Sequence, residues 1–340
     1  MQSTARRRQT ATVPAVVPAI APTEAQVWAN LEKYAVDARG AFAPNSMRAM
    51  KSDIKLFTGW CGEQGHQAMP ASPDVVAAYV DAMAASKAPA TVRRYCASLA
   101  MFHRAAGVAN PCEALTVTLA LKRMHKAKGR AQLQPSGLNE GHVRKLLEVR
   151  GGQHGNPLRD LRNRALLVTG YVTLCRESEL TALQFADLRV EPDGFGTLHI
   201  RFSKGDQEGR GATVAVPADA MRHLLKWIEA AGITSGPLFR AVRHNGGIGG
   251  ALDPGAVARI FKTMATAAKL PPDKDGKPLR ISGHSTRIGA AVDMLRYKET
   301  LVAIMVAGRW KSPEMVGRYV REQEARDSAA NRIAAAREPF

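Results

Sequence analysis

The sequence has little cysteine and no long apolar run. Its four cysteines, Cys61, Cys96, Cys112 and Cys175, form no CxxC pair, and its nine histidines show no zinc-ligand spacing. A disulfide scaffold and a structural zinc site are therefore not expected, and a reducing cytoplasm fits the composition best. No apolar stretch reaches the length of a transmembrane helix, so we expect no membrane partner.

Acidic residues are also scarce relative to basic ones. The chain of 340 residues contains 48 Lys and Arg but only 30 Asp and Glu, which gives a formal net charge of +18. Both halves of the chain share this excess, which indicates a protein that grips one long polyanion, most simply nucleic acid. A solvated basic surface without a specific ligand is the alternative interpretation.

Long β-branched runs are few and helix-forming residues dominate, so the sequence predicts a mainly α fold. The length allows two domains. Residues 1–22 are expected to form a disordered basic arm, although Arg6 to Ala21 also has the outline of a secretory signal, interrupted by Pro14 and Pro18. The predicted order after the arm is an all-helical domain at 23–121, a basic linker at 122–135 and a mostly helical α+β domain at 136–340.

Cap signals and apolar stripes predict the helices of the first domain. They are expected to begin near Thr23, Pro44, Ser72, Pro89 and residue 112. The helices that begin at Pro44 and Pro89 each combine an apolar stripe with a basic or polar face, as expected of helices that lie in a DNA groove.

The second domain is predicted to contain a small β-hairpin among its helices. Residues 197–203 and 212–216 read as two strands, with Lys204 at the mouth of the hairpin. The Gly-rich stretch 246–250 lacks the spacing of a phosphate-binding loop and is expected to be a flexible connection. A terminal helix that carries Ile333 is expected to pack on its own domain or on a neighbouring molecule.

A donor-rich motif lies near the C-terminal end, at residues 282–287 (SGHSTR). His284 and Arg287 are three residues apart, which places both on one face of a helix, and Tyr319 follows downstream. These groups suit chemistry on a phosphodiester, because the arginine and histidine can hold phosphate oxygens while the phenol attacks phosphorus.

Together with earlier residues, this motif resembles the signature of the tyrosine recombinases. The residues that carry the resemblance are, in order, Arg176, Glu179, Lys204, His284, Arg287, Trp310 and Tyr319. Each motif alone has an ordinary structural explanation. Arg176 and Glu179, taken by themselves, would be interpreted as an ion pair on a helix surface. The complete set in matching contexts is hard to obtain by chance. Many relatives have a histidine at the position of Trp310. The tryptophan therefore makes this chain more similar to the Cre-like branch of the family.

The resemblance implies a role for each of these residues. Tyr319 is implied to be the nucleophile that forms a 3′-phosphotyrosyl link, while Arg176 and Arg287 bind the nonbridging oxygens. Lys204 is the candidate acid for the leaving 5′-oxygen, with Arg201 and Lys226 as alternatives.

The remaining members of the set are implied to assist. His284 handles a proton at the tyrosine or donates to the phosphate, and Trp310 contacts the phosphate through its indole N–H. Glu179 orients the arginines and the histidine. No metal or other cofactor is expected, because the arginines supply the charge that Mg²⁺ supplies in nucleases with carboxylate clusters.

The resemblance also implies DNA partners and assembly. It implies site-specific recombination at an inverted-repeat, lox-like site, with two protomers on one site and four in synapsis, by a DNA-associated cytoplasmic enzyme. A type IB topoisomerase and a non-enzymatic DNA-binding protein are the alternatives. Candidate DNA contacts, chosen by position on the matching helices, are Asn45, Ser46, Arg48, Lys51, Thr91, Arg94 and Ser98.

Overall fold

The computed structural model describes residues 22–130, 133–149, 156–203, 206, 209–273, 275–326, 331 and 333. The chain divides into two compact units, Met1–Gln132 and Leu133–Phe340. The predicted arm, apart from residue 22, and most of the predicted terminal helix lie outside the described residues. Within the part of the chain that is described, no helix is both long and apolar enough to cross a membrane.

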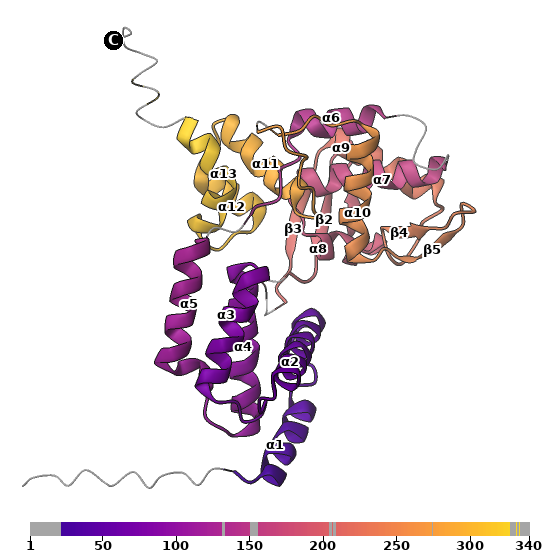
Figure 1. The fold of residues 1–340 in the computed structure, drawn as a ribbon. Helices are drawn as coiled ribbons and strands as arrows, with labels where there is room; N and C mark the ends of the chain where they lie inside the picture. The colour runs from indigo at the N-terminus through magenta and orange to yellow at the C-terminus, as the bar shows by residue number, and fades with distance from the viewer. Residues whose placement is uncertain are drawn as a thin grey trace, which may run out of the picture. The chain divides into compact units, whose positions relative to one another are not determined.

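The described part of the first unit is helical (Figure 1). A capping box between Thr23 and Gln26 starts the first helix, and the Ser72 side chain caps the third. Phe57, Tyr79 and Leu99, which come from three successive helices, lie in the core of the unit. The elements are α1 (Glu24–Asp37), α2 (Pro44–Gln64), α3 (Pro73–Ser86), α4 (Pro89–Ala106), the 3₁₀ turn η1 (Pro111–Glu113) and α5 (Leu115–Lys128).

Helix α5 is longer than the sequence predicted. It continues to Lys128, and its residue Met124 is buried in the core of the first unit. The linker predicted at 122–135 is therefore wrong at its N-terminal end, because residues 122–128 belong to the helix. Val117, Ala120 and Met124 form one buried stripe at helical spacing, which the surrounding lysines and arginines obscure in the sequence.

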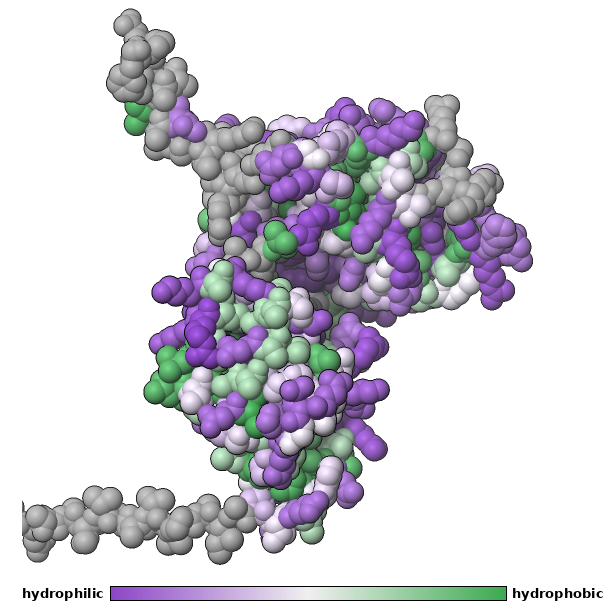
Figure 2. Space-filling view, in the orientation of Figure 1, coloured by the Kyte–Doolittle hydropathy of each residue, from purple (hydrophilic) through white to green (hydrophobic). Residues whose placement is uncertain are grey.

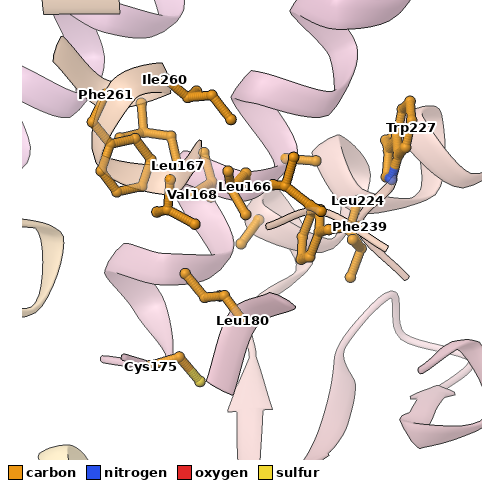
Figure 3. Close-up of a cluster of buried hydrophobic side chains, with 14 of the residues drawn as sticks. Leu166, Leu167, Val168, Cys175, Leu180, Leu224, Trp227, Phe239, Ile260 and Phe261 are labelled. Carbon is orange, nitrogen blue, oxygen red and sulfur yellow. The ribbon is translucent and has the colours of Figure 1, made fainter. Parts of the chain in front are cut away.

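The second unit is built around helix α7 (Pro157–Val172). Leu166 and Leu167 of α7 are fully buried in a core cluster that also contains Trp227 of α9 (Ala218–Ala230) and Phe261 of α10 (Pro254–Ala267) (Figure 3). The indole N–H of Trp227 donates a hydrogen bond of 2.9 Å to the carbonyl of Leu238. The other helices are α6 (Glu140–Glu148), α8 (Glu177–Ala182), α9 (Ala218–Ala230), α10 (Pro254–Ala267), α11 (Ser285–Arg296), α12 (Leu301–Gly308) and α13 (Pro313–Arg326).

Two small antiparallel sheets complete the described part of this unit. β1 (Leu188–Val190), β2 (Gly196–Ile200) and β3 (Ala212–Val216) form a meander after the short turn η3 (Phe185–Asp187). β4 (Arg240–Val242) pairs with β5 (Ile248–Ala251). The prediction of a flexible connection at 246–250 is wrong for residues 248–250. Strands pair through backbone hydrogen bonds, which glycine can also make. The pairing of β5 with β4 therefore cannot be predicted from the amino-acid composition of residues 248–250. The mainly α fold with a small β component agrees with the prediction.

A separate buried cluster joins the last three helices to the segment before α8. It contains Leu174, Ala291, Ile304, Trp310 and Val316. On the face drawn in Figure 2, hydrophilic and apolar residues of the described part of the chain are interspersed. The cluster of Leu174, Ala291, Ile304, Trp310 and Val316 packs α11, α12 and α13 together (yellow and orange in Figure 1), and these helices carry Arg287 and Tyr319.

Candidate active site

Arg176 and Glu179 form a buried pair at the start of α8. Glu179, 2% exposed, accepts the backbone N–H of Arg176 at 3.0 Å and its guanidinium Nη1 at 2.5 Å. An acidic side chain in the first turn satisfies an orphan backbone N–H and favours the helix N-terminus. The pair is therefore a buried orienting contact, and the surface ion-pair interpretation is wrong.

Arg287 is held by backbone carbonyls from two distant segments. Its Nη1 donates to the carbonyl of Leu174, and its Nη2 donates to the carbonyl of Gly308, the last residue of α12. The side chain is 2% exposed. Because these acceptors are neutral, the guanidinium keeps its positive charge available for an anion.

Trp310 contacts both Arg287 and Tyr319. The central guanidinium carbon of Arg287 lies 4.1 Å from the Trp310 ring centroid, and the Tyr319 ring centroid lies 5.8 Å from the same tryptophan. Trp310 is buried, while Tyr319 on α13 is half-buried. A guanidinium over an indole face is an attractive arrangement, so the three side chains support one another's positions.

His284 is the residue at which α11 begins. Its backbone N–H donates 3.1 Å to the hydroxyl of Ser282, and its side chain is exposed three residues before Arg287. Ser285 locks the same turn, since its hydroxyl accepts the Ser282 N–H at 2.9 Å. The structure thus presents the imidazole to solvent at the start of the helix that carries the buried arginine.

Burial and neighbouring arginines shift the pKa values of Arg287 and Glu179. Burial, together with the neighbouring charges of Arg176 and Arg309, lowers the pKa of Arg287 to about 10. Burial alone would raise the pKa of Glu179, but the backbone N–H of Arg176 and the guanidinium groups of Arg309 and Arg176 hold that pKa below its ordinary value. Glu179 pairs with Arg176 and Arg309, and Arg287 lies close enough for its charge to interact with theirs, so positive charge exceeds negative charge in this region.

Lys204 lies outside the described residues. Ser203 and Asp206 on either side of it form an isolated antiparallel bridge, and the Asp206 N–H donates 3.0 Å to the Ser203 carbonyl. Of the alternatives, Arg201 donates 2.6 Å to the buried carboxylate of Asp187, and Lys226 is exposed on α9. The assignment of the acid therefore stays a prediction.

Six of the seven candidate DNA contacts lie at least partly on the surface of the first unit. Arg48 donates 2.7 Å to Asn45 within the first turns of α2. Thr91 is half-buried, and the exposed members are Asn45, Ser46, Arg48, Lys51 and Arg94. Helices α2 and α4 pack together, so these residues come from adjacent elements.

Ser98 differs from the other candidates, because its side chain points into the unit. It is 7% exposed, and its hydroxyl donates 2.8 Å to the buried carboxylate of Asp53, which also pairs with Arg94 at 2.9 Å. A direct DNA contact by Ser98 does not fit this position. The sequence analysis missed Asp53, although an acidic residue at helical spacing from Met50 and Phe57 in a buried stripe was the available signal.

Arg309 is the site residue that sequence reasoning missed. It precedes Trp310, and its Nη2 donates 2.9 Å to Glu179. Arg309 directly follows Gly308, the last residue of α12, at a position where glycine is usual. An arginine at such a position was the available signal.

Two family models and two curated proteins match most of the chain. The family model described as "Phage integrase family" matches residues 138–326, and that described as "Phage integrase, N-terminal SAM-like domain" matches residues 34–109. The chain is 30% identical over 302 residues to an integrase/recombinase xerD homolog of Selenomonas ruminantium, covering 86% of each chain. It is 27% identical over 310 residues to recombinase cre of Escherichia phage P1, covering 87% of this chain and 89% of that protein.

Solved structures share the fold. A lambda integrase dimer bound to a COC′ core site superposes with a TM-score of 0.59 at 18% identity, covering 87% of this chain and 77% of that chain. The XerH recombinase bound to a palindromic difH substrate gives 0.59 at 16% identity, covering 93% of this chain and 91% of that chain. With one family model spanning more than half of its residues, the chain belongs to the phage integrase family of tyrosine recombinases, enzymes that cleave and rejoin DNA at specific sites.

Proposed function

We propose that this recombinase cleaves DNA by forming a covalent 3′-phosphotyrosyl link through Tyr319. The observation that carries the proposal is the contact of Trp310 with both Arg287 and Tyr319, at separations of 4.1 Å and 5.8 Å. One indole therefore touches an anion-binding guanidinium and a phenol. The nucleophile and the group that would bind the phosphate are near each other, as attack on a phosphodiester requires.

The chemistry is an exchange of one phosphoester for another. The phenolic oxygen of Tyr319 forms a bond to phosphorus and releases its proton, while the bond from phosphorus to the 5′-oxygen breaks and that oxygen gains a proton. Rejoining reverses the exchange with the 5′-hydroxyl of another strand. The number of phosphoester bonds is conserved, so the reaction requires no ATP.

The arginines supply the positive charge in this proposal. Arg176 and Arg287 hold the nonbridging oxygens and offset the charge of the pentacoordinate transition state, a task for which the guanidinium fork is well shaped. His284 manages the proton at the tyrosine or donates to the phosphate, and Lys204 protonates the leaving 5′-oxygen. Because two arginines do the work of a cation, we expect cleavage without a metal ion.

The target is proposed to be an inverted-repeat, lox-like site. Two protomers occupy one site, and two sites synapse as a tetramer, with the terminal helix around Ile333 as the proposed contact between protomers. The DNA-bound lambda integrase dimer and tetramer among the structures of similar fold support this assembly. Val302 and Val306 of α12 are 69% and 73% exposed, and they offer an apolar surface that self-association can cover.

A nicked duplex tests the covalent mechanism. With a nick beside the scissile phosphate, the released fragment diffuses away, so the wild-type protein should accumulate a protein–DNA adduct, in EDTA as well. Tyr319→Phe should form none. Tyr297→Phe is the matched control, because Tyr297 is exposed and donates 2.5 Å to Glu140 in the same unit. An adduct formed by Tyr319→Phe would overturn the assignment of the nucleophile.

The substrate for that assay comes from a selection. Random genomic and phage DNA fragments are incubated with the protein, the bound fragments are sequenced, and the enriched fragments are aligned. We expect an inverted repeat with a short central spacer. Enrichment without a repeated half-site would contradict the proposed dimeric target.

A further inference from the structure

Arg309 occupies a backbone position that suits glycine. It follows the last residue of α12 with φ 55° and ψ 43°, in the left-handed region. Residues with a β-carbon are disfavoured there, and glycine is the usual residue just past a helix end. A long side chain at this point therefore calls for a compensating interaction.

The side chain of Arg309 points into the active site. Only 15% of it is exposed. Its Nη2 donates 2.9 Å to the carboxylate of Glu179, and its Nη1 donates 3.1 Å to the carbonyl of Thr173. The same short segment, through Leu174, supplies a carbonyl to Arg287. Arg309 thus ties the end of α12 to the segment that leads into α8.

Glu179 is held at both of its oxygens, and Arg309 is the partner that comes from outside α8. Oε1 accepts Nη1 of Arg176, while Oε2 accepts both the backbone N–H of Arg176 and Nη2 of Arg309. The bonds from Arg176 come from the first turn of the same helix, so with these alone the pair could move together with that turn. The bond from Arg309 ties Glu179 to the end of α12 and so fixes the direction of the Arg176 guanidinium before DNA arrives.

Arg309 also adds charge to the site. Its guanidinium, together with burial and Arg176, lowers the pKa of Arg287. The buried Nε of Arg309 has no hydrogen-bond partner among the described residues. Glu179 is the carboxylate that both Arg176 and Arg309 contact, so a net positive charge remains where the phosphate is proposed to bind.

We infer that Arg309 is a positioning residue for strand cleavage, which fixes Glu179 and through it the guanidinium of Arg176. The inference rests on the proposed function of the site. It makes a specific claim about rate, since a residue that acts through Glu179 lowers the rate of the chemical step by more than any change in DNA affinity or fold stability accounts for.

The experiment compares Arg309→Gly with wild type on the nicked substrate under single-turnover conditions. Glycine suits the left-handed backbone, but the contacts with Glu179 and Thr173 are lost, so the two effects oppose each other and the melting temperature should change by only a few degrees. DNA affinity should stay within about two-fold, and the cleavage rate constant should fall by about 10- to 100-fold, the usual effect of losing an orienting partner. Arg309→Lys keeps the charge without the fork and should lie between the two.

Lys269→Gly is the matched control. Lys269 is an exposed residue after the end of α10 with φ 46°, so it makes the same backbone change away from the site residues. Its cleavage rate should equal that of wild type. A lower rate in this control would show that glycine at a helix end is itself harmful, and the argument from Arg309→Gly would fail.

A double mutant tests whether the effect passes through Glu179. In a Glu179→Gln background, Arg309→Gly should lower the rate by less than about three-fold further, because residues that act as one unit are not additive. Full additivity, or a rate loss that follows a loss of melting temperature, would overturn the positioning role. If Arg309→Gly cleaves at the same rate as the wild-type protein, this inference alone is wrong. If the wild-type protein forms no adduct at all, the proposed function is wrong as well.

Discussion

The guanidinium of Arg287 lies over the indole of Trp310, with 4.1 Å between its central carbon and the ring centroid. Gly308 makes this contact possible in two ways. Its carbonyl accepts a hydrogen bond from Arg287, and its lack of a side chain leaves room for the ring. A β-carbon on Gly308 would lie only 1.9 Å from a Trp310 ring carbon. The end of α12 therefore sets both partners of the cation–π pair.

Gly308→Ala should displace Trp310 from Arg287. The overlap is with a buried ring, and overpacking of this kind typically costs about 1–3 kcal/mol. We expect a lower melting temperature and a cleavage rate constant reduced at least about ten-fold, since small misplacements at a reacting centre have large effects. Single-turnover cleavage and thermal unfolding measure these changes.

Gly317→Ala is the control for that variant. Gly317 lies on α13, and a β-carbon there meets no atom within 4 Å. Alanine is the better helix former by about 0.5–1 kcal/mol, so stability should rise slightly and cleavage should be retained. Normal cleavage by Gly308→Ala would show that the position of the Trp310 ring is unimportant.

Trp310→Phe separates the two functions of the tryptophan. Phenylalanine keeps an aromatic face for Arg287 but has no N–H to donate to a phosphate. A hydrogen bond to a charged group contributes about 1.5–3 kcal/mol, so the cleavage rate constant should fall about 10- to 150-fold while the fold is retained. Trp28→Phe, at an exposed position on α1, serves as the control. Equal rates for Trp310→Phe and wild type would assign Trp310 to packing alone.

The stability of the second unit should depend on pH through Glu179. Its pKa in the folded protein lies below the ordinary value of 4.5: burial opposes the charge, but the contacts with Arg176 and Arg309 outweigh it. The unfolded chain therefore binds this proton more readily. The contribution of Glu179 to the free energy of unfolding is complete above pH 4.5 and is lost as the pH falls through the folded-state pKa.

Glu179→Gln should reveal that contribution. At pH 7 it removes the charge that faces two arginines, and breaking a buried pair costs about 3 kcal/mol. The difference from wild type should shrink as the pH is lowered below 4.5, which urea unfolding at a series of pH values measures. Glu229→Gln, exposed on α9, should show no such trend. A difference that stays constant with pH would contradict the ionised state of Glu179.

Arg94→Ala should weaken DNA binding uniformly across sequences. An exposed arginine that contacts phosphate releases about one counterion, so the slope of log affinity against log salt should fall by about one. Asp53→Asn should give a smaller loss with the slope unchanged, because Arg94 keeps its charge and loses only its 2.9 Å anchor. Fluorescence anisotropy at several salt concentrations measures both. Lys33→Ala, on α1, is the control, and an unchanged slope for Arg94→Ala would remove Arg94 from the interface.

Local signals in the sequence were reliable where the physics is local. The capping box at Thr23, the cap at Ser72 and the prolines that open α2 and α4 predicted helix starts, because each satisfies backbone groups within one turn. The α5 boundary and strand β5 were missed. Both depend on contacts with other segments: Met124 in α5 is buried in the core of the first unit, and β5 pairs with β4.

The sequence by itself determined the chemistry that the chain can carry: a phenol, an imidazole, arginines and an indole in a recognisable order. Only the tertiary structure decided which of them meet. Glu179 and Arg309 are 130 residues apart, and Arg287 reaches a carbonyl 113 residues away, so no periodicity could pair them. Burial of Ser98 and Asp53 likewise follows from the packing of α2 on α4. The physical reason is that side-chain contacts across a core depend on which faces pack, and that is a property of the whole fold.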